Sequence, residues 1–471
     1  MGESFVIAVD FGTAYSGYTF NTSTREKEND PILKRWGAGE GLDTPKTPTC
    51  ILFNEKGEFL KFGYEAKKAY IKMRGEEANR HYFFEGFKMD LYNKDFNKDL
   101  KIKAANGEEM EALKVFSESL KFLKDDALKT INANNAGLPF PASNFTWVLM
   151  VPAICDESAK QFMREAAIQA GIITEGDDKK LVITLELEAA SVWCKKLPAD
   201  GFISEKHNTK SLDQTPENHN TKSLAQTPEN HNTKSLAQTP ENHNTKPLDQ
   251  TPGTQYLIVD CGGGTIDITV HKVLKGGALK ELHKASGNNL GGQNVDRKFK
   301  EFLREIFTDG VWDEYEQKYP NAIQRIMYEF TRLKQVDEDV KIPCPDSLGQ
   351  LAEQKKDIER FFESVQGASW DEGYIIISRE KLKTFFDDIL QGITMSLREI
   401  LNKNLKIDFI LTVGGLAESQ IVRELINEEF SEEYKILCPA RPQEAILRGA
   451  VLYPCGEHVE RFDESKHKQQ K

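Results

Sequence analysis

The sequence predicts an α/β protein with two lobes and a ligand cleft between them. Strands alternate with helices at both ends of the chain, which is typical of sheets covered by helices. In addition, a unit made of a strand, an aspartate, a glycine-bearing turn and a second strand occurs twice, near residue 10 and near residue 260. Two such units facing one another would hold a ligand from both sides, because ligands commonly bind in clefts.

The first unit starts with the apolar segment 5–9, which we expect to form a strand. Asp10 ends this strand, the segment 11–17 (FGTAYSG) turns, and residues 18–20 begin a second strand. The unit therefore repeats, at the start of the chain, the order of features that is found again near residue 260.

The second unit has a continuous apolar run at 256–259, a glycine turn, and an alternating strand from residue 266 to residue 270. The turn residues lack a Cβ atom, so the backbone can crowd against a ligand and its N–H groups can form an anion nest: they are Gly262, Gly263 and Gly264. Asp260 and Asp267 flank the turn, and carboxylates beside phosphates indicate a divalent cation between them. The alternative is a hairpin whose glycines only turn the chain, but a matched pair of such hairpins weakens it.

Length and composition narrow the class of protein. The chain has 471 residues, which fits two to three compact units. Its net charge of −12 argues against nucleic acid or an anionic membrane as the main partner. No apolar run approaches the roughly 18–20 residues of a membrane span, and no secretory signal is present. Seven scattered cysteines match neither a disulfide framework nor a zinc site, so we expect a cytoplasmic protein.

Apolar runs and periodicity predict the other elements of the first half. We expect strands at 49–53, 58–62, 145–151 and 181–185, and helices at 63–73, 108–131, 158–170 and 186–196. The segment 81–91 (HYFFEGFKMDL) is unusually aromatic. From the residues alone, its phenylalanines are expected in the core and Lys88 in solvent.

Residues 207–254 consist of four copies of a 12-residue unit, such as HNTKSLAQTPEN. Each copy has one leucine and otherwise mostly polar residues, which cannot bury enough apolar surface to offset the entropy lost on ordering. A solenoid would need an apolar face in every repeat. The histidines are spaced too widely in a flexible segment to favour a metal site. We therefore expect a disordered insert in a surface loop.

After the second unit, a polar turn is expected at 286–296, followed by helices at 295–307, 311–335 and 382–401 and a strand at 374–378. The strand 409–413 leads into Gly414 and Gly415, with a helix from about residue 418 whose N-terminus would lie beside a ligand. A last helix is expected at 442–452, and residues 456–471 form a polar tail.

Five segments resemble, in the same order, motifs of one family. They are DFGTAYSG, VPAICDESAKQFMREAAIQAGI, LELEAAS, VDCGGGTIDITV and VGGLAESQIV. The chain resembles the actin-like ATPase superfamily, and in particular the nucleotide-binding domain of seventy-kilodalton heat-shock chaperones and their divergent heat shock 70 kDa protein 12 branch. The resemblance covers nearly the whole chain outside the repeats. It implies a two-lobed actin-like ATPase (ribonuclease H-like) fold with a central nucleotide cleft that binds ATP or ADP with Mg²⁺.

Carried over position by position, the resemblance assigns roles around the phosphates. Asp10 and Asp260 would hold Mg²⁺, mostly through its waters. Glu186 would orient the attacking water, Asp267 would be a second candidate base, and Lys88 would steady the γ-phosphate. The residues that would contact the phosphates are Gly12, Thr13, Ala14 and Tyr15 from one lobe, and Gly262, Gly263, Gly264 and Thr265 from the other.

On the nucleoside side, the resemblance implies a pocket lined by Gly291, Gly292, Glu329, Arg332, Gly414, Gly415 and Leu416. Pro152 matches a proline proposed to switch the relative position of the lobes. The implied lobes are 1–190, with a small subdomain at about 39–110, and 191–405, with the repeats and a helical subdomain at about 295–380. The adenosine motif and closing helices would occupy 406–455.

Several positions depart from the family pattern. Ala14 replaces a threonine, Leu416 replaces a serine, and Gln443 stands where the family has an aspartate in the outer shell of the metal. These changes are compatible with ATP binding and predict slow hydrolysis, since phosphoryl transfer depends on positioning and charge neutralisation. The chain also ends soon after its last expected helix, so we expect no C-terminal peptide-binding domain.

The function expected from the resemblance is that of a monomeric, ATP-binding, slowly hydrolysing conformational switch or chaperone-like factor that signals to an unidentified protein partner. An inactive nucleotide-binding scaffold is the main alternative. A metabolite kinase would need a substrate carboxylate in the cleft and a sugar-kinase motif, and a filament former would need an apolar self-association patch; the sequence provides no clear sign of either.

Overall fold

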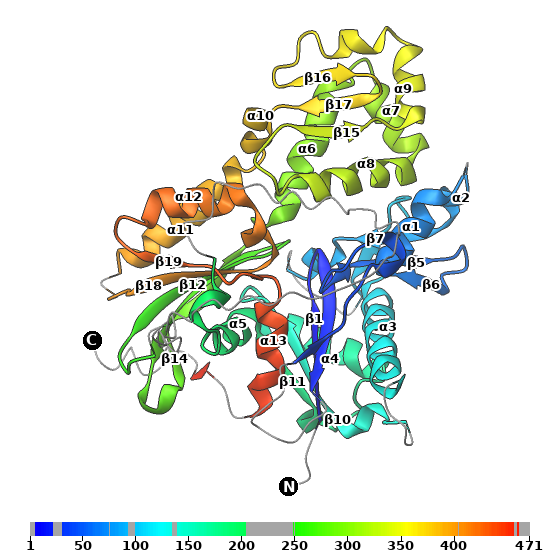
Figure 1. Ribbon diagram of the computed structural model, residues 1–471. Coiled ribbons are helices and arrows are strands. Elements are labelled where there is room, and N and C mark those ends of the chain that lie inside the picture. Colours follow the sequence, from blue (N-terminus) through cyan, green and yellow to red (C-terminus); the bar gives the residue numbers. More distant parts are fainter. Residues whose placement is uncertain are drawn as a thin grey trace, which may run out of the picture.

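The computed structural model of the protein describes residues 5–21, 31–74, 76–92, 99–133, 139–203, 248, 250–403, 405–455 and 459–460. Two six-stranded sheets form the body of the molecule, and each contains one of the glycine hairpins (Figure 1). The first contains β1 (Phe5–Phe11), β2 (Tyr15–Asn21), β3 (Ile32–Leu33), β4 (Thr47–Pro48), β10 (Phe145–Val151) and β11 (Leu181–Leu185). The second contains β12 (Gln255–Cys261), β13 (Ile266–Val273), β14 (Leu279–Asn288), β18 (Phe409–Val413), β19 (Lys435–Leu437) and β20 (Val459–Glu460).

The two sheets share their local topology. The strand order is β11-β10-β1-β2-β3 in the first, with β4 paired to β2, and β19-β18-β12-β13-β14-β20 in the second. In each sheet the first hairpin strand, β1 or β12, pairs antiparallel with its partner in the hairpin and parallel with a later strand, β10 or β18. The predicted α/β architecture with a repeated hairpin unit is therefore confirmed.

The central strands read as continuous apolar runs because both of their faces are buried. On β1, the side chains of Ile7 and Val9 pack in one cluster with the helices α3 (Ala112–Ala133) and α4 (Glu157–Gln169). Val6 and Ala8 point to the opposite face and pack in a second cluster. This period of two along the strand explains why no polar residue interrupts the segment 5–9.

Two helices form the layer between the sheets. They are α5 (Glu186–Cys194) and α13 (Ala445–Leu452), and their apolar residues share a cluster with strands of both sheets (Figure 1). The helices approach closely at Gly449, because a Cβ atom there would collide with the backbone of Ala189. The pair therefore links the first half of the chain to its C-terminal part.

The remaining elements surround this body. A small sheet of order β6-β5-β7 packs with α1 and α2, and a three-stranded sheet of order β15-β17-β16 lies among α6 to α10 (Figure 1). Helices α11 and α12 cover the outer face of the second sheet. Within the described ranges, no helix is both long and apolar enough to cross a bilayer.

The bounds of these elements are α1 (Gly63–Lys72), α2 (Glu77–Arg80), α6 (Gly292–Ile306), α7 (Val311–Lys318), α8 (Pro320–Leu333), α9 (Asp346–Glu353), α10 (Arg379–Thr384), α11 (Asp387–Leu401), α12 (Gln420–Phe430), β5 (Cys50–Phe53), β6 (Phe59–Phe62), β7 (Tyr82–Glu85), β8 (Lys101–Lys103), β9 (Glu109–Glu111), β15 (Val340–Pro343), β16 (Ala368–Asp371) and β17 (Tyr374–Ile377).

Several predicted boundaries are wrong. Residues 109–111 are not the start of a helix but form β9, which pairs with β8 across a turn at Gly107, where φ is 86°. Residues 286–288 belong to β14 rather than to a turn, and α6 starts at Gly292. The single helix expected at 382–401 is two helices, α10 and α11. Polar hairpins and short helices carry weak periodicity, so local sequence does not define their ends.

The end of the repeat segment is ordered, contrary to our expectation. Most of the repeats, 207–247 and 249, lie outside the described residues. However, Leu248 is only 2% exposed and packs in the cluster between the sheets. Gln250 Nε2 donates a hydrogen bond of 2.5 Å to the carbonyl oxygen of Lys195. The leucine of the last copy is therefore part of the core, which our expectation for this segment did not include.

A buried histidine predicts how stability depends on pH. Burial of His271 on β13 lowers its pKa to about 4. Its Nδ1 lies 2.9 Å from Ser191 Oγ, and its Nε2 has no hydrogen-bond partner among the described residues. The unfolded state, with an ordinary pKa near 6.5, binds this proton first as the pH falls. The contribution of the neutral His271 side chain to the free energy of unfolding is therefore intact above about pH 6.5. It is lost toward pH 4, at about 1.4 kcal/mol per pH unit.

We expect His271→Phe to remove this component, so that its free energy of unfolding falls less steeply than that of the wild type between pH 6.5 and pH 4.5. Urea unfolding at several pH values measures the difference between the two slopes, and other titrating groups cancel in that difference. Equal slopes would contradict the assignment. His81→Phe is the matched control, because His81 is partly exposed, and it should leave the slope unchanged.

Candidate functional site

A cavity of about 340 Å³ lies between the two hairpin turns. It brings together most of the residues that were predicted for the nucleotide site. Those that line it are Asp10, Gly12, Thr13, Ala14, Tyr15, Lys88, Glu186, Asp260, Gly262, Gly263, Gly264, Thr265, Gly292, Arg332, Gly414, Gly415 and Leu416. Pro152 lines it as well. The predicted residues that do not line it are Asp267, Gly291 and Glu329.

The two glycine turns touch each other directly. A Cβ atom at Gly263 would lie 2.5 Å from the Cβ of Ala14, and one at Gly264 would lie 2.6 Å from Oγ1 of Thr13. Only glycine permits this approach, because real Cβ contacts are never so short. The turn of one sheet is therefore packed against the turn of the other at the wall of the cavity.

Gly291 and Gly292 both contact the second turn, and Gly292 also lines the cavity. A Cβ atom at Gly291 would collide with the backbone of Gly263 and Gly264. The N–H of Gly292 donates to the carbonyl oxygen of Gly262 at 3.1 Å, and Gln293 N–H donates to that of Gly263 at 2.8 Å. The first amides of α6 therefore donate to the second turn.

The glycine pair after β18 has two different roles. Gly414 has φ 92°, and a Cβ atom there would collide with Oδ1 of Asp260. Gly415 has no atom within 4 Å of such a position. A short 3₁₀ helix (Gly415–Glu418) follows and α12 begins only at Gln420, so the helix expected from about residue 418 is preceded by this turn. Leu416 is buried and faces the cavity.

Four carboxyl groups, three of them buried and one partly exposed, lie at or near the cavity. Asp10 and Asp260 are the penultimate residues of β1 and β12, the partly exposed Glu186 begins α5, and Asp267 lies on β13 outside the lining. Asp10 and Asp260 therefore occupy equivalent places in the two hairpin units. Asp267 accepts a hydrogen bond of 2.8 Å from Thr265 Oγ1.

The electrostatics of this cluster favour a bound cation. Burial, together with the charges of Glu186 and Asp267, raises the pKa of Asp260 well above its usual range. Burial and Glu186 raise the pKa of Asp267 to about 8. One oxygen of each, Oδ1, has no hydrogen-bond partner among the described residues. Ionised carboxylates at these positions would therefore repel one another, and a cation bound between them would relieve that repulsion.

Lys88 is buried at 1% exposure, so the prediction that it is solvated is wrong. Its Nζ lies 3.6 Å from Oε1 of Glu186. It sits in a short 3₁₀ helix (Phe87–Leu91) that follows Gly86, whose φ of 69° turns the chain inward. Burial raises the pKa of Glu186 and Lys88 opposes that rise. Lys88 also lines the cavity, and its role at the γ-phosphate stays a prediction.

A second lysine in the cavity was not predicted. Lys46 makes an ion pair with Asp10, and both side chains are buried. Burial lowers the pKa of Lys46, but the carboxylates of Asp10, Glu186 and Asp260 more than offset this, so the net shift is upward. Within the sequence, Lys46 is one lysine in a turn-rich segment, and only the pairing of strands brings it to Asp10.

The residues at the cavity fit a nucleotide with Mg²⁺. In the described part of the chain, no three or more His, Cys, Asp or Glu side chains form a complete metal cage. Mg²⁺ does not require one, because it retains waters and takes one or two carboxylates plus phosphate oxygens. Asp10 and Asp260 would supply these carboxylates, and the unpartnered oxygen of Asp260 is consistent with that role. The apposed turns leave backbone N–H groups for phosphates.

On the predicted nucleoside side, Arg332 lines the cavity, with its guanidinium 5.9 Å from the ring centre of Tyr328. Glu329 lies outside the lining, and its carboxylate is 3.8 Å from Arg332. Lys334 is also present and was not predicted; its Nζ donates to the carbonyl oxygen of Gly292 at 2.9 Å.

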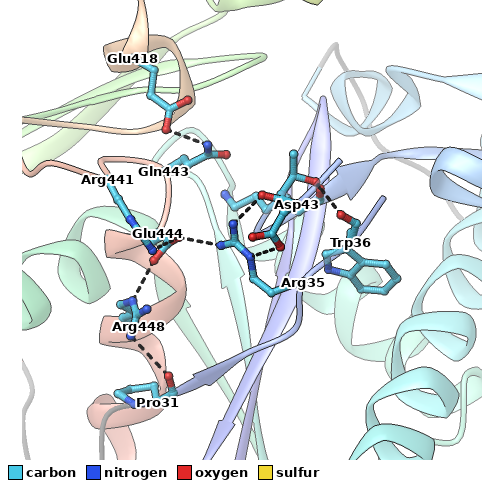
Figure 2. Close-up of polar contacts among 11 residues, drawn as sticks. Pro31, Arg35, Trp36, Asp43, Glu418, Arg441, Gln443, Glu444 and Arg448 are labelled. Carbon is cyan, nitrogen blue, oxygen red and sulfur yellow. Dashed lines mark hydrogen bonds and ion pairs between the residues drawn. The ribbon is translucent and has the colours of Figure 1, made fainter. Parts of the chain in front are cut away.

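Gln443, one of the departures from the family pattern, lines the cavity. Its Nε2 donates a hydrogen bond of 2.7 Å to Oε1 of Glu418 (Figure 2). Burial raises the pKa of Glu418, while this hydrogen bond opposes the rise. The next residue, Glu444, is buried and accepts from Arg35 at 2.9 Å and from Arg448 at 3.0 Å.

Comparison with known proteins agrees with this geometry. Residues 248–456 match the family model described as Hsp70 protein. The chain is 33% identical to heat shock 70 kDa protein 12A of Mus musculus, over 95% of this chain and 69% of that protein. It is 31% identical to heat shock 70 kDa protein 12B of Homo sapiens, over 96% of this chain and 68% of that protein.

A more distant match is the chaperone protein DnaK of Elusimicrobium minutum, with 26% identity over 42% of this chain and 30% of that protein. The fold is that of the actin-like ATPases, and the relatives support an Hsp70-like nucleotide-binding protein. The chain belongs to the Hsp70 family and, within it, to the heat shock 70 kDa protein 12 group.

Proposed function

We propose that this protein binds ATP and ADP with Mg²⁺ in the cavity, hydrolyses ATP slowly, and acts as a nucleotide-dependent conformational switch for a protein partner. The observation that supports this most strongly is the direct contact of the two glycine turns above buried carboxyl groups. A phosphate chain held by both turns contacts both sheets at once. Its binding is therefore coupled to the relative position of the two halves of the chain.

The side chains at the cavity have separate roles in nucleotide binding and hydrolysis. When bound, Mg²⁺ supplies charge neutralisation for the phosphates, and Asp10 and Asp260 hold it. Lys88 lies in the cavity, where it adds positive charge beside the terminal phosphate. Glu186 orients a water molecule, and Asp267, which accepts a hydrogen bond from Thr265 outside the cavity lining, is a second candidate base.

Slow turnover follows from two features of the site. Glu186 is engaged by Lys88, so its carboxylate is only partly free to orient water. Gln443 donates its amide to Glu418 and offers no negative charge to the cation. If these features abolish turnover altogether, the protein is a nucleotide-binding scaffold. Binding and turnover therefore have to be measured separately.

The test uses the full chain, with ATP affinity from calorimetry and hydrolysis from single-turnover assays in Mg²⁺. We expect the wild type to bind ATP and to hydrolyse it slowly. Glu186→Gln should retain the affinity within about threefold and lower the single-turnover rate by about a hundredfold or more.

Glu399→Gln is the matched control, because Glu399 is exposed and pairs with Lys403 at 2.9 Å on the surface. It should leave both quantities unchanged. ATP binding without measurable turnover in the wild type would select the scaffold function. Absence of binding would overturn the proposal as a whole.

A further inference from the structure

The ammonium group of Lys46 already occupies the neighbourhood of one carboxylate that would hold the metal. Lys46 is 9% exposed and Asp10 is 2% exposed, so their ion pair is shielded from solvent. Lys46 also lines the cavity together with Glu186 and Asp260, and it interacts electrostatically with both. The cluster thus contains a fixed positive charge of the protein's own.

Strand pairing explains how Lys46 reaches this place. Asp10 on β1 pairs with Gly17 on β2. On the other side of β2, Tyr15 pairs with Pro48 and Ser16 pairs with Thr47, so the same register places Lys46 beside Gly17. A Cβ atom at Gly17 would lie 3.2 Å from Cγ of Lys46. The missing side chain of Gly17 therefore lets the lysine pass across β2 to Asp10.

The loop that carries Lys46 is anchored at several points. Thr44 Oγ1 donates to the carbonyl oxygen of Lys46 at 2.8 Å. Arg35 pairs with Asp43 in the same loop at 2.7 Å and with Glu444, next to α13, at 2.9 Å (Figure 2). These contacts connect the loop to the helical layer between the sheets. Lys46 is thus held against the carboxyl groups rather than being free in solvent.

The ion pair between Lys46 and Asp10 affects how tightly the site would bind a metal ion. An oxygen of Asp10 that pairs with an ammonium is less available to a cation, and two positive charges in one buried cluster repel each other. At the same time, the ammonium lowers the repulsion between the carboxyl groups and a phosphate chain when no metal is present. Lys46 therefore weakens the binding of the metal and supports the binding of metal-free nucleotide.

We propose that Lys46 is a resident counter-ion of the metal-holding carboxylates, and that it makes nucleotide binding by this protein largely independent of Mg²⁺. The proposal rests on the proposed nucleotide binding and adds a property to it: the protein can hold ATP or ADP in either metal state. Lys46 is a positioning residue in this account, because it acts on the carboxylates and not on the reacting atoms.

The first measurement is the affinity for a fluorescent ADP analogue, with saturating Mg²⁺ and with EDTA. For the wild type, we expect the two dissociation constants to differ by less than about tenfold. Lys46→Gln should widen this difference at least about tenfold, by weakening binding in EDTA. Lys46→Arg keeps the charge and should behave like the wild type. Lys46→Met, which also lacks the charge, is the second variant if the glutamine form does not fold.

The matched control is Lys34→Gln. Lys34 belongs to the same segment and pairs with Asp126 at 3.3 Å, but it does not line the cavity. Its removal should leave the difference between Mg²⁺ and EDTA unchanged. An equal Mg²⁺ dependence in the wild type and in Lys46→Gln would overturn the inference.

The second measurement needs no nucleotide. Binding of Mn²⁺, followed by electron paramagnetic resonance, should be at least about tenfold tighter in Lys46→Gln than in the wild type, because Asp10 is released and a repelling charge is removed. Unchanged or weaker Mn²⁺ binding would overturn the inference even if no nucleotide bound to any variant. Failure of nucleotide binding alone would instead count against the proposed function.

Discussion

Replacing Gly263 with alanine is expected to weaken ATP and ADP binding by about tenfold to a hundredfold. The added Cβ atom would lie 2.5 Å from the Cβ of Ala14, so one of the two turns has to move. Overpacking of this kind typically costs about 1–3 kcal/mol, and that strain falls on the wall of the cavity. Calorimetric titration of the full chain with ADP measures the loss.

Gly39→Ala is the matched control. Gly39 lies in a short 3₁₀ helix (Ala38–Glu40) outside the cavity lining, and no atom lies within 4 Å of an added Cβ atom. This variant should bind nucleotide like the wild type. If Gly263→Ala also bound nucleotide normally, the contact between the two turns would have no part in ligand binding. The proposal that nucleotide binding is coupled to the relative position of the two halves of the chain would then lose its support.

The strands of the two large sheets were predictable because their sequence signal is local. Residues 5–9 are a continuous apolar run, 145–151 and 409–413 each contain one threonine among apolar residues, and all three segments are strands that are largely buried on both faces. The carboxyl groups at the ends of such strands could also be predicted, since Asp10 and Asp260 directly follow them. The hairpin of β8 and β9 was missed because both strands are short and mostly polar.

The two buried lysines show what local sequence does not contain. Lys88 lies in an aromatic segment where a charge is expected to point to solvent, yet its partner Glu186 is almost a hundred residues away. Lys46 depends on the pairing of β4 with β2 and on a glycine opposite it. Both positions follow from long-range register, and only the family resemblance, not the local pattern, indicated one of them. Leu248 is a similar case, because the core position that it fills is built by distant segments.

Replacing Asp260 with asparagine is expected to have opposite effects on stability and on binding. Asp260 is 2% exposed, one of its oxygens has no hydrogen-bond partner among the described residues, and Glu186 and Asp267 are close. Burial and these charges raise its pKa, so its ionised form destabilises the folded protein near pH 7. We expect Asp260→Asn to raise the free energy of unfolding without ligand by about 1–2 kcal/mol.

The pH dependence of this gain has a definite sign. Because its pKa is raised in the folded state, Asp260 binds a proton more tightly in the folded wild type than in the unfolded chain. The contribution of protonated Asp260 to the free energy of unfolding is therefore present in acid and is lost as the pH rises through the folded pKa. The advantage of the asparagine variant should therefore shrink as the pH falls from 7 toward 5. Urea unfolding at both pH values measures it, with the exposed Asp371→Asn as the control for removal of a carboxylate.

The same substitution should reduce the affinity for ATP in Mg²⁺ to about that in EDTA, a loss of up to about tenfold, since one of the two carboxylates that would hold the cation is lost. Binding in EDTA should change much less, because Lys46 and the glycine turns remain. Sites that bind charged ligands commonly retain groups that destabilise the empty protein, and Asp260 fits that description. A variant that was less stable, yet still bound ATP with undiminished Mg²⁺ support, would mean that Asp260 serves the fold and not the ligand.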